Sequence, residues 1–187
     1  TARRPGGTIA REVQERGGSI NAYTTFDRTV YYVDLPSEHA AFGLDLMADM
    51  VFSPTLAEED IRKERDVILR EIDMGLDDPD NAATRLLLAS AFQHDPRRHP
   101  VIGHRHRFDA IAYEDLVGYQ KERYTTDRSF VVISGDFDAD ETRKLVAELT
   151  AECQQGCGRE PLVATDAPQL GPRRARETFA IPASRIS

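Results

Sequence analysis

The sequence predicts a mixed α+β fold, and three observations support this prediction. Stretches with apolar residues at three- and four-residue spacing are separated by helix-breaking residues, which is typical of amphipathic helices. Two β-rich segments, residues 19–26 and 29–35, flank Asp27-Arg28 and predict a hairpin. The apolar run over residues 129–135 predicts a further strand, central in its sheet.

Composition limits the classes of protein to which the chain can belong. Its 187 residues are enough for one domain with a core, and 40% apolar with 30% charged residues excludes a disordered chain. A formal net charge of -8 argues against a nucleic-acid binder held by phosphate contacts. The longest apolar runs are only a few residues, so we expect no membrane span.

The first helices are predicted from caps and breakers. Thr8 is expected to cap a helix over residues 9–16, which two following glycines end. Pro36 ends the second strand, and Ser37 is expected to cap a helix that runs to about Phe52.

A long helix is predicted next. Thr55 and Glu58 have the spacing of a capping box, in which each side chain binds a backbone N–H at the start of a helix. Gly75 and the following acidic residues are expected to interrupt this helix. Asp78 as cap and Pro79 at the first position then restart a helix to about residue 92. Three later segments complete this part of the chain: a polar loop over 94–106, a helix over 113–124, and a helix from Asp138 or Asp140 to near residue 156.

The composition changes after residue 155. We therefore predict a domain over residues 1–155, a proline-rich linker over 156–176, and the start of a following strand within 177–187. Both ends of the chain look cut. Cys153 and Cys157 are interpreted as free thiols, since two cysteines do not make a disulfide framework and no further metal ligands are near them.

Two acidic residues on the long helix raise a question about chemistry. Glu64 and Glu71 lie at the same helical spacing as the apolar stripe Ala57, Ile61, Ile68, Ile72 and Gly75. A buried carboxylate costs several kcal/mol unless it is paired, hydrogen-bonded or bound to a metal. The two carboxylates are two turns apart, about 10 Å along the axis. Two explanations remain open: ion pairs or N–H groups from a neighbouring element, or one metal ligand with a second acid that supports it.

The histidines do not complete a metal site by themselves. None of the five histidines forms H-x-x-E-H or H-E-x-x-H. His104 and His106 alternate in a loop and could reach one ion, but a loop rich in Arg, His and Pro is more often solvated. His39 is interpreted as a surface residue.

Several blocks of the sequence resemble one family. Arg4-Pro-Gly-Gly-Thr8 is followed by Gly17-Gly-Ser-Ile-Asn-Ala-Tyr-Thr-Thr-Phe26 and by Glu64-Arg-Asp-Val-Ile-Leu-Arg-Glu-Ile72, and further blocks occur at 29–32, 53–54, 99–103, 113–116 and 131–136. In this order, the blocks resemble the pitrilysin or insulinase-type zinc metallopeptidases, which include the mitochondrial processing peptidases. The resemblance covers about residues 4 to 150.

The resemblance implies a fold and a metal. The fold would be a largely antiparallel sheet with helices packed on one face. Zinc in this family is held by two histidines of an H-x-x-E-H motif and by a downstream glutamate, which Glu71 matches. Glu64 matches a second acidic position that supports the site. Because the motif is absent here, we expect the histidine ligands upstream of Thr1. The parent would be an active enzyme of which this chain is a fragment, or an inactive subunit of the family.

The resemblance also implies how a substrate binds. Ser19, Ile20, Asn21, Ala22 and Tyr23 resemble the edge strand to which a substrate peptide adds as a further strand. A plain hairpin strand is the alternative.

The expected function is zinc-dependent endopeptidase activity on unfolded or presequence-like peptides, with a second homologous domain or subunit as partner. The fragment alone is expected to be inactive. The alternatives are a non-catalytic scaffold or regulatory subunit of the same fold, and an unrelated α+β binding domain. Low cysteine content fits a reducing cytoplasm, while a periplasmic or mitochondrial matrix location stays open.

Overall fold

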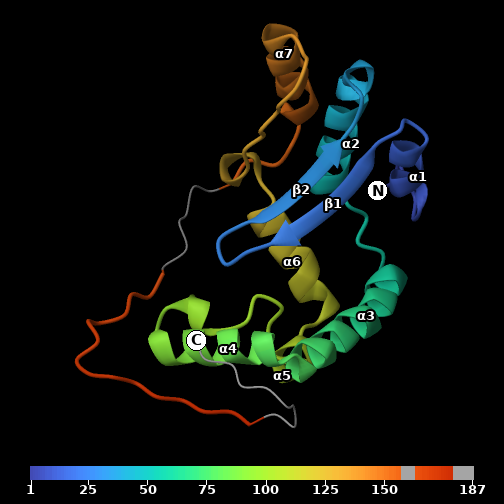
Figure 1. Cartoon of the computed structure of the whole chain (residues 1–187). Coiled ribbons are helices and arrows are strands. Elements are labelled where there is room, and N and C mark those ends of the chain that lie inside the picture. The colour runs from blue at the N-terminus through green and yellow to red at the C-terminus, as the bar shows by residue number, and fades with distance from the viewer. Residues whose placement is uncertain (157–162, 179–187) are drawn as a thin grey trace. The chain divides into compact units, whose positions relative to one another are not determined.

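The computed structural model describes residues 1–156 and 163–178. The chain divides into two compact units, Thr1–Thr24, Arg28–Ala57 and Ala112–Arg159 in the first, and Thr25–Asp27, Glu58–Ile111 and Glu160–Ser187 in the second. The elements of the described chain are α1 (Thr8–Gln14), β1 (Ser19–Thr24), β2 (Thr29–Asp34), η1 (Ser37–His39), α2 (Ala40–Phe52), α3 (Glu58–Asp77), α4 (Pro79–Ala91), η2 (Pro96–Arg98), α5 (Arg105–Asp109), α6 (Tyr113–Arg123), η3 (Thr126–Arg128) and α7 (Ala139–Thr150). Figure 1 labels the α-helices and the two strands.

The predicted hairpin is confirmed and forms the sheet of the first unit. β1 and β2 pair antiparallel, with Ser19 opposite Asp34 and Thr24 opposite Thr29. β-Branched and aromatic residues dominate β2, and such residues fit a pleated strand well. The α+β class and the antiparallel pairing are therefore as predicted.

The core of the first unit lies around α1 and α2. Val13 of α1 and Leu46 of α2 are fully buried, and α2 lies against β2 and α7. Gly43 of α2 is buried, and a Cβ at this position would lie only 2.9 Å from a methyl carbon of Leu35, just after β2. The absence of that Cβ allows α2 to approach the end of the hairpin closely.

Two predicted caps in this unit are wrong. Thr8 is the first residue of α1, and the cap position is held by Gly7 in the left-handed conformation, with φ of 78°. Ser37 begins a short 3-10 turn, so α2 starts only at Ala40. In contrast, the first of the two predicted starts of α7 is confirmed, since the Asp138 carboxylate caps the helix and accepts from the N–H groups of Asp140 and Glu141 at 3.0 and 2.8 Å. The predicted end near residue 156 is wrong, because α7 ends at Thr150.

The predicted central strand over residues 129–135 is also wrong. The segment has no regular secondary structure and pairs with no strand among the described residues, and Phe130 and Val132 are 77% and 80% exposed. Apolar composition favours a strand only where a partner supplies the hydrogen bonds of the ladder.

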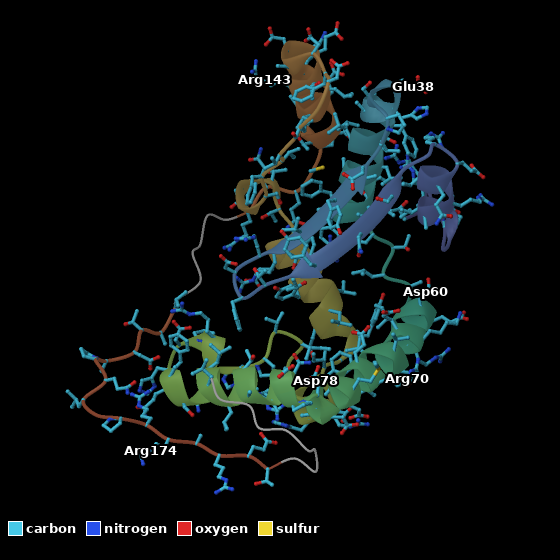
Figure 2. All side chains as sticks on the ribbon, in the orientation of Figure 1. Glu38, Asp60, Arg70, Asp78, Arg143 and Arg174 are labelled. Carbon is cyan, nitrogen blue, oxygen red and sulfur yellow. The ribbon has the colours of Figure 1, made fainter. Side chains whose placement is uncertain are left out.

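In the second unit, α3 runs unbroken from Glu58 to Asp77. The predicted capping box is wrong, because Glu58 is the first residue of α3 and a capping box with Thr55 would need it to be the third. The predicted interruption at Gly75 is also wrong, because Gly75 lies inside the helix. Asp78 then caps α4 as predicted, since its Oδ1 accepts from Asp80 N at 2.8 Å and Pro79 is the first residue. Figure 2 labels Asp78 at this junction.

Some predictions fall partly or wholly on residues outside the description. Cys157 and most of the segment 177–187 belong to this group, whereas Cys153 is described as a free thiol. Among the residues that the structure describes, no helix combines the length and the apolarity needed to cross a bilayer.

Candidate functional site

Glu64 and Glu71 are both exposed on α3, so the prediction that they are buried is wrong. The side of α3 that packs is centred on Ile72, which is 4% exposed. At about 100° per residue, Glu71 lies roughly 100° around the helix from Ile72, and Glu64 lies about 80° from it. The two carboxylates therefore border the apolar stripe, on one side of the helix, instead of sharing it.

The polar group on the packed side of α3 is a guanidinium. Arg65 donates to the backbone carbonyls of Ile111 and Phe108, both at 3.0 Å, and to that of Asp109 at 2.9 Å. Its guanidinium carbon also lies 5.1 Å from the centre of the Phe108 ring. Arg65 thus fixes α3 to the end of α5. The signal for this role was present in the sequence, because position 65 shares a face with Ile61, Ile68 and Ile72.

No complete metal site is present among the described residues. No group of three or more His, Cys, Asp or Glu side chains in residues 1–156 and 163–178 could hold a metal ion. His104 lies between two other histidines: its Nε2 is 3.1 Å from His99 Nδ1, and its ring stacks on His106 at 5.8 Å between centroids. Burial first, and then the charges of His99, His106, Arg107 and Arg85, lower the pKa of His104.

The β1 strand is accessible along most of its length. Ile20 is half-buried, while Ser19, Asn21, Ala22 and Tyr23 are exposed. Among the described strands β1 pairs only with β2, so its other edge carries no strand. The N–H of Ala22 donates to the Asn21 side-chain oxygen at 2.8 Å. The candidate substrate-binding residues therefore all lie on β1, a strand with one edge free of any described strand.

A buried ionic network that the sequence did not reveal anchors the Arg4-Pro-Gly-Gly turn. The Arg4 guanidinium donates to Asp49 at 2.7 Å, to Asp45 at 2.5 Å and to Glu12 at 3.1 Å. Asp45 and Asp49 are one turn apart on α2, a spacing that places both on one face. Burial alone would raise the pKa of Asp49, but hydrogen bonds from Thr1, Arg4 and Arg3 outweigh it and hold that pKa below its ordinary value.

Comparisons with known proteins agree with the resemblance drawn from the motifs. The model of the insulinase family, peptidase family M16, matches residues 1–105. A protein of Mycobacterium leprae named as an uncharacterized zinc protease is 36% identical over 148 residues, which cover 79% of this chain and 33% of the relative. The mitochondrial-processing peptidase subunit beta of Blastocladiella emersonii is 33% identical over 152 residues, which cover 81% of this chain and 33% of that protein.

Two solved structures share the fold. An M16-like peptidase from Alicyclobacillus acidocaldarius superposes with a TM-score of 0.74 at 32% identity, over 84% of this chain and 36% of the other. A protease from Helicobacter pylori superposes with a TM-score of 0.81 at 21% identity, over 87% of this chain and 40% of the other. The chain spans about a third of the length of the curated relatives described above. By the match over more than half of its residues, the chain belongs to the insulinase family, peptidase family M16.

Proposed function

We propose that the chain is part of a zinc-dependent endopeptidase that cleaves unfolded or presequence-like peptides. The observation that carries this proposal is family membership over residues 1–105, a region that contains β1, Glu64 and Glu71. The names of the relatives, zinc protease and processing peptidase, support the same class of reaction.

Glu71 is proposed as an anionic zinc ligand. Its carboxylate is exposed on α3, and no described residue forms a hydrogen bond or ion pair with it. The described residues supply no imidazole that completes the site, so they do not fit zinc by themselves. We therefore propose that the remaining ligands come from residues beyond the described ones.

Glu64 is proposed as an acid that supports the site without binding the ion. It lies about 10 Å from Glu71 along the axis of α3, too far for both to bind one zinc with ligand distances near 2 Å. Carboxylates outside the ligand set orient the ligands and tune affinity by about 10–100-fold.

The test is the zinc content of the full-length protein in three matched variants. Glu71→Gln is expected to lose zinc after dialysis against a chelator, and Glu64→Gln to retain it with lower affinity. Glu58→Gln, an exposed change at the start of α3, is the control and should leave zinc unchanged. Full zinc retention by Glu71→Gln would remove Glu71 from the ligand set, and full-length protein with neither zinc nor peptidase activity would favour the scaffold.

The substrate is proposed to add to the exposed edge of β1 as a further strand. Main-chain hydrogen bonds would then supply affinity with little demand on side chains. Peptides with N-methyl groups at alternate backbone nitrogens are expected to bind the full-length protein more weakly, whereas peptides with altered side chains bind about equally. Equal binding of the N-methylated peptides would exclude strand addition.

The isolated 187 residues are expected to bind zinc weakly and to show no peptidase activity, because a second, similar domain or subunit would complete the enzyme. Robust zinc-dependent cleavage by this chain alone would refute that expectation.

A further inference from the structure

The end of α4 and the loop after it present two kinds of backbone group. Gln93, His94 and Asp95 direct three consecutive N–H groups to one point. Successive N–H groups of this kind form a concave anion-binding site. Just before them, the carbonyls of Ser90 and Ala91 lie at the C-terminal end of α4, where a helix leaves carbonyl groups without intrahelical partners.

A carboxylate from a distant part of the chain occupies the three N–H groups. Asp166 accepts from Gln93 N at 2.9 Å, His94 N at 2.7 Å and Asp95 N at 3.4 Å. Burial alone would raise the pKa of Asp166, but these backbone donors outweigh it and hold the pKa below its ordinary value.

The receiving loop is itself held in place. The Asp95 carboxylate accepts from the Arg97 side chain at 2.9 and 2.7 Å and from the Arg97 backbone N–H at 2.9 Å. The same hydrogen bonds lower the pKa of Asp95 to about 2. The loop is therefore also held by contacts that do not involve Asp166.

Two more charged residues of the same segment bind α4. Arg173 donates to the carbonyls of Ser90 and Ala91 at 2.9 and 2.8 Å, which places a cation at the C-terminal end of the helix, where its dipole favours positive charge. Glu177 lies 3.3 Å from Arg85 in an ion pair. Asp166, Arg173 and Glu177 thus bind three sites along α4 and its loop.

Apolar burial contributes little to this docking. Leu170 is 100% exposed and Val163 is 59% exposed. A pocket of about 400 Å³ lies at this contact and is lined by Gln93 and His94 of the loop and by Pro168 and Pro172 of the segment, among others. The contacts that hold the segment are therefore mainly charged and close to solvent, where salt screens them.

We propose that residues 163–178 form an electrostatic strap that docks reversibly on the end of α4, with Asp166 and Arg173 as anchors, and that rising ionic strength releases it. Figure 1 draws this strap as the red trace. Release uncovers the three N–H groups and the helix carbonyls. The inference does not depend on the proposed peptidase function.

Hydrogen exchange of the whole 187-residue chain, read by mass spectrometry, tests the strap. Peptides that contain Gln93, His94 and Asp95 should exchange about tenfold faster at 1 M than at 0.05 M sodium chloride, since one hydrogen bond to a charged group contributes about 1.5 kcal/mol or more. Sucrose at matched osmolarity should have no such effect. Equal exchange at both salt concentrations would overturn the proposal.

Matched variants separate docking from unfolding. Asp166→Asn and Arg173→Gln should each reproduce the fast exchange of residues 93–95 at low salt. Arg174→Gln, an equal change of charge at the exposed neighbour labelled in Figure 2, should not. Exchange in α3 should stay unchanged in all three variants. Slow exchange of residues 93–95 in both anchor variants, or fast exchange in Arg174→Gln, would overturn the proposal.

Discussion

Replacing Arg4 with methionine is expected to cost about 3–5 kcal/mol of the free energy of unfolding, because removing one partner leaves buried charge uncompensated. The Arg4 side chain is 10% exposed and forms ion pairs with Asp49, Asp45 and Glu12, whose side chains are 3%, 29% and 26% exposed. Asp49 is expected to contribute most of this loss of unfolding free energy, because it is the most buried of the three carboxylates.

Arg3 moderates the loss. Its Nε lies 3.2 Å from Asp49, so one cation remains beside that carboxylate in the Arg4→Met variant. Methionine also keeps much of the apolar stem that Arg4 buries. The lower end of the range, about 3 kcal/mol, is therefore expected.

Urea denaturation followed by circular dichroism provides the measurement. Arg4→Met, Asp49→Asn and the double variant form a cycle, and the double variant should cost at least about 1 kcal/mol less than the sum of the single changes, since the two groups interact directly. Arg11→Met is the control. Arg11 is 67% exposed and 3.7 Å from Glu15, so its loss should cost under about 1 kcal/mol. A cost below about 1 kcal/mol for Arg4→Met would refute the reasoning.

The same network predicts a dependence on pH. Burial alone would raise the pKa of Asp45, but hydrogen bonds from Arg4 and Arg3 outweigh burial and lower that pKa. The pKa of Asp49 is lowered in the same way. A carboxyl whose pKa is lower in the folded state stabilises fully above its unfolded pKa, about 3.9, and loses this contribution as pH falls through the folded pKa. Stability should therefore decline below about pH 4, and less steeply in the Arg4→Met variant.

Three further predictions concern local contacts. Tyr31→Phe and Tyr124→Phe should each lower the free energy of unfolding in urea by about 1 kcal/mol, because either change removes the 2.9 Å contact between the two hydroxyls. An unchanged free energy of unfolding in either variant would contradict this prediction. Asp78→Ala should cost about 1 kcal/mol through loss of the α4 cap, while Asp77→Ala at the exposed end of α3 costs under about 0.5. Arg65→Met should speed hydrogen exchange in α5 more than in α4, since it leaves three carbonyls without their donor.

The features that the sequence predicted well depend on residues close together in the chain. The hairpin follows from β-rich segments around a short turn, and the α4 start follows from Asp78 before Pro79. The Thr55 capping box failed although its spacing is correct, because Leu56, with φ of 46°, intervenes before the helix begins at Glu58.

The features that the sequence did not predict depend on distant partners. Arg4 and Asp49 are 45 residues apart, and Asp166 and Gln93 are 73 apart, so no local pattern connects them. The residues predicted as a linker, 156–176, include Asp166, which binds the loop after α4, and Arg173, which binds the end of α4. Proline and glycine content indicates the absence of regular structure, not the absence of contacts.

The exposure of Glu71 changes how its role can be tested. A buried glutamate would confound loss of zinc with loss of fold, since removing a buried charge perturbs its surroundings. Glu71 is exposed, and no described residue pairs with it, so Glu71→Gln should change the free energy of unfolding of this chain by less than about 0.5 kcal/mol. A loss of zinc from the full-length variant, with this stability unchanged, then identifies a lost ligand. Family membership supports a metal at Glu71, and this measurement tests it, because the burial that first suggested a metal is not present.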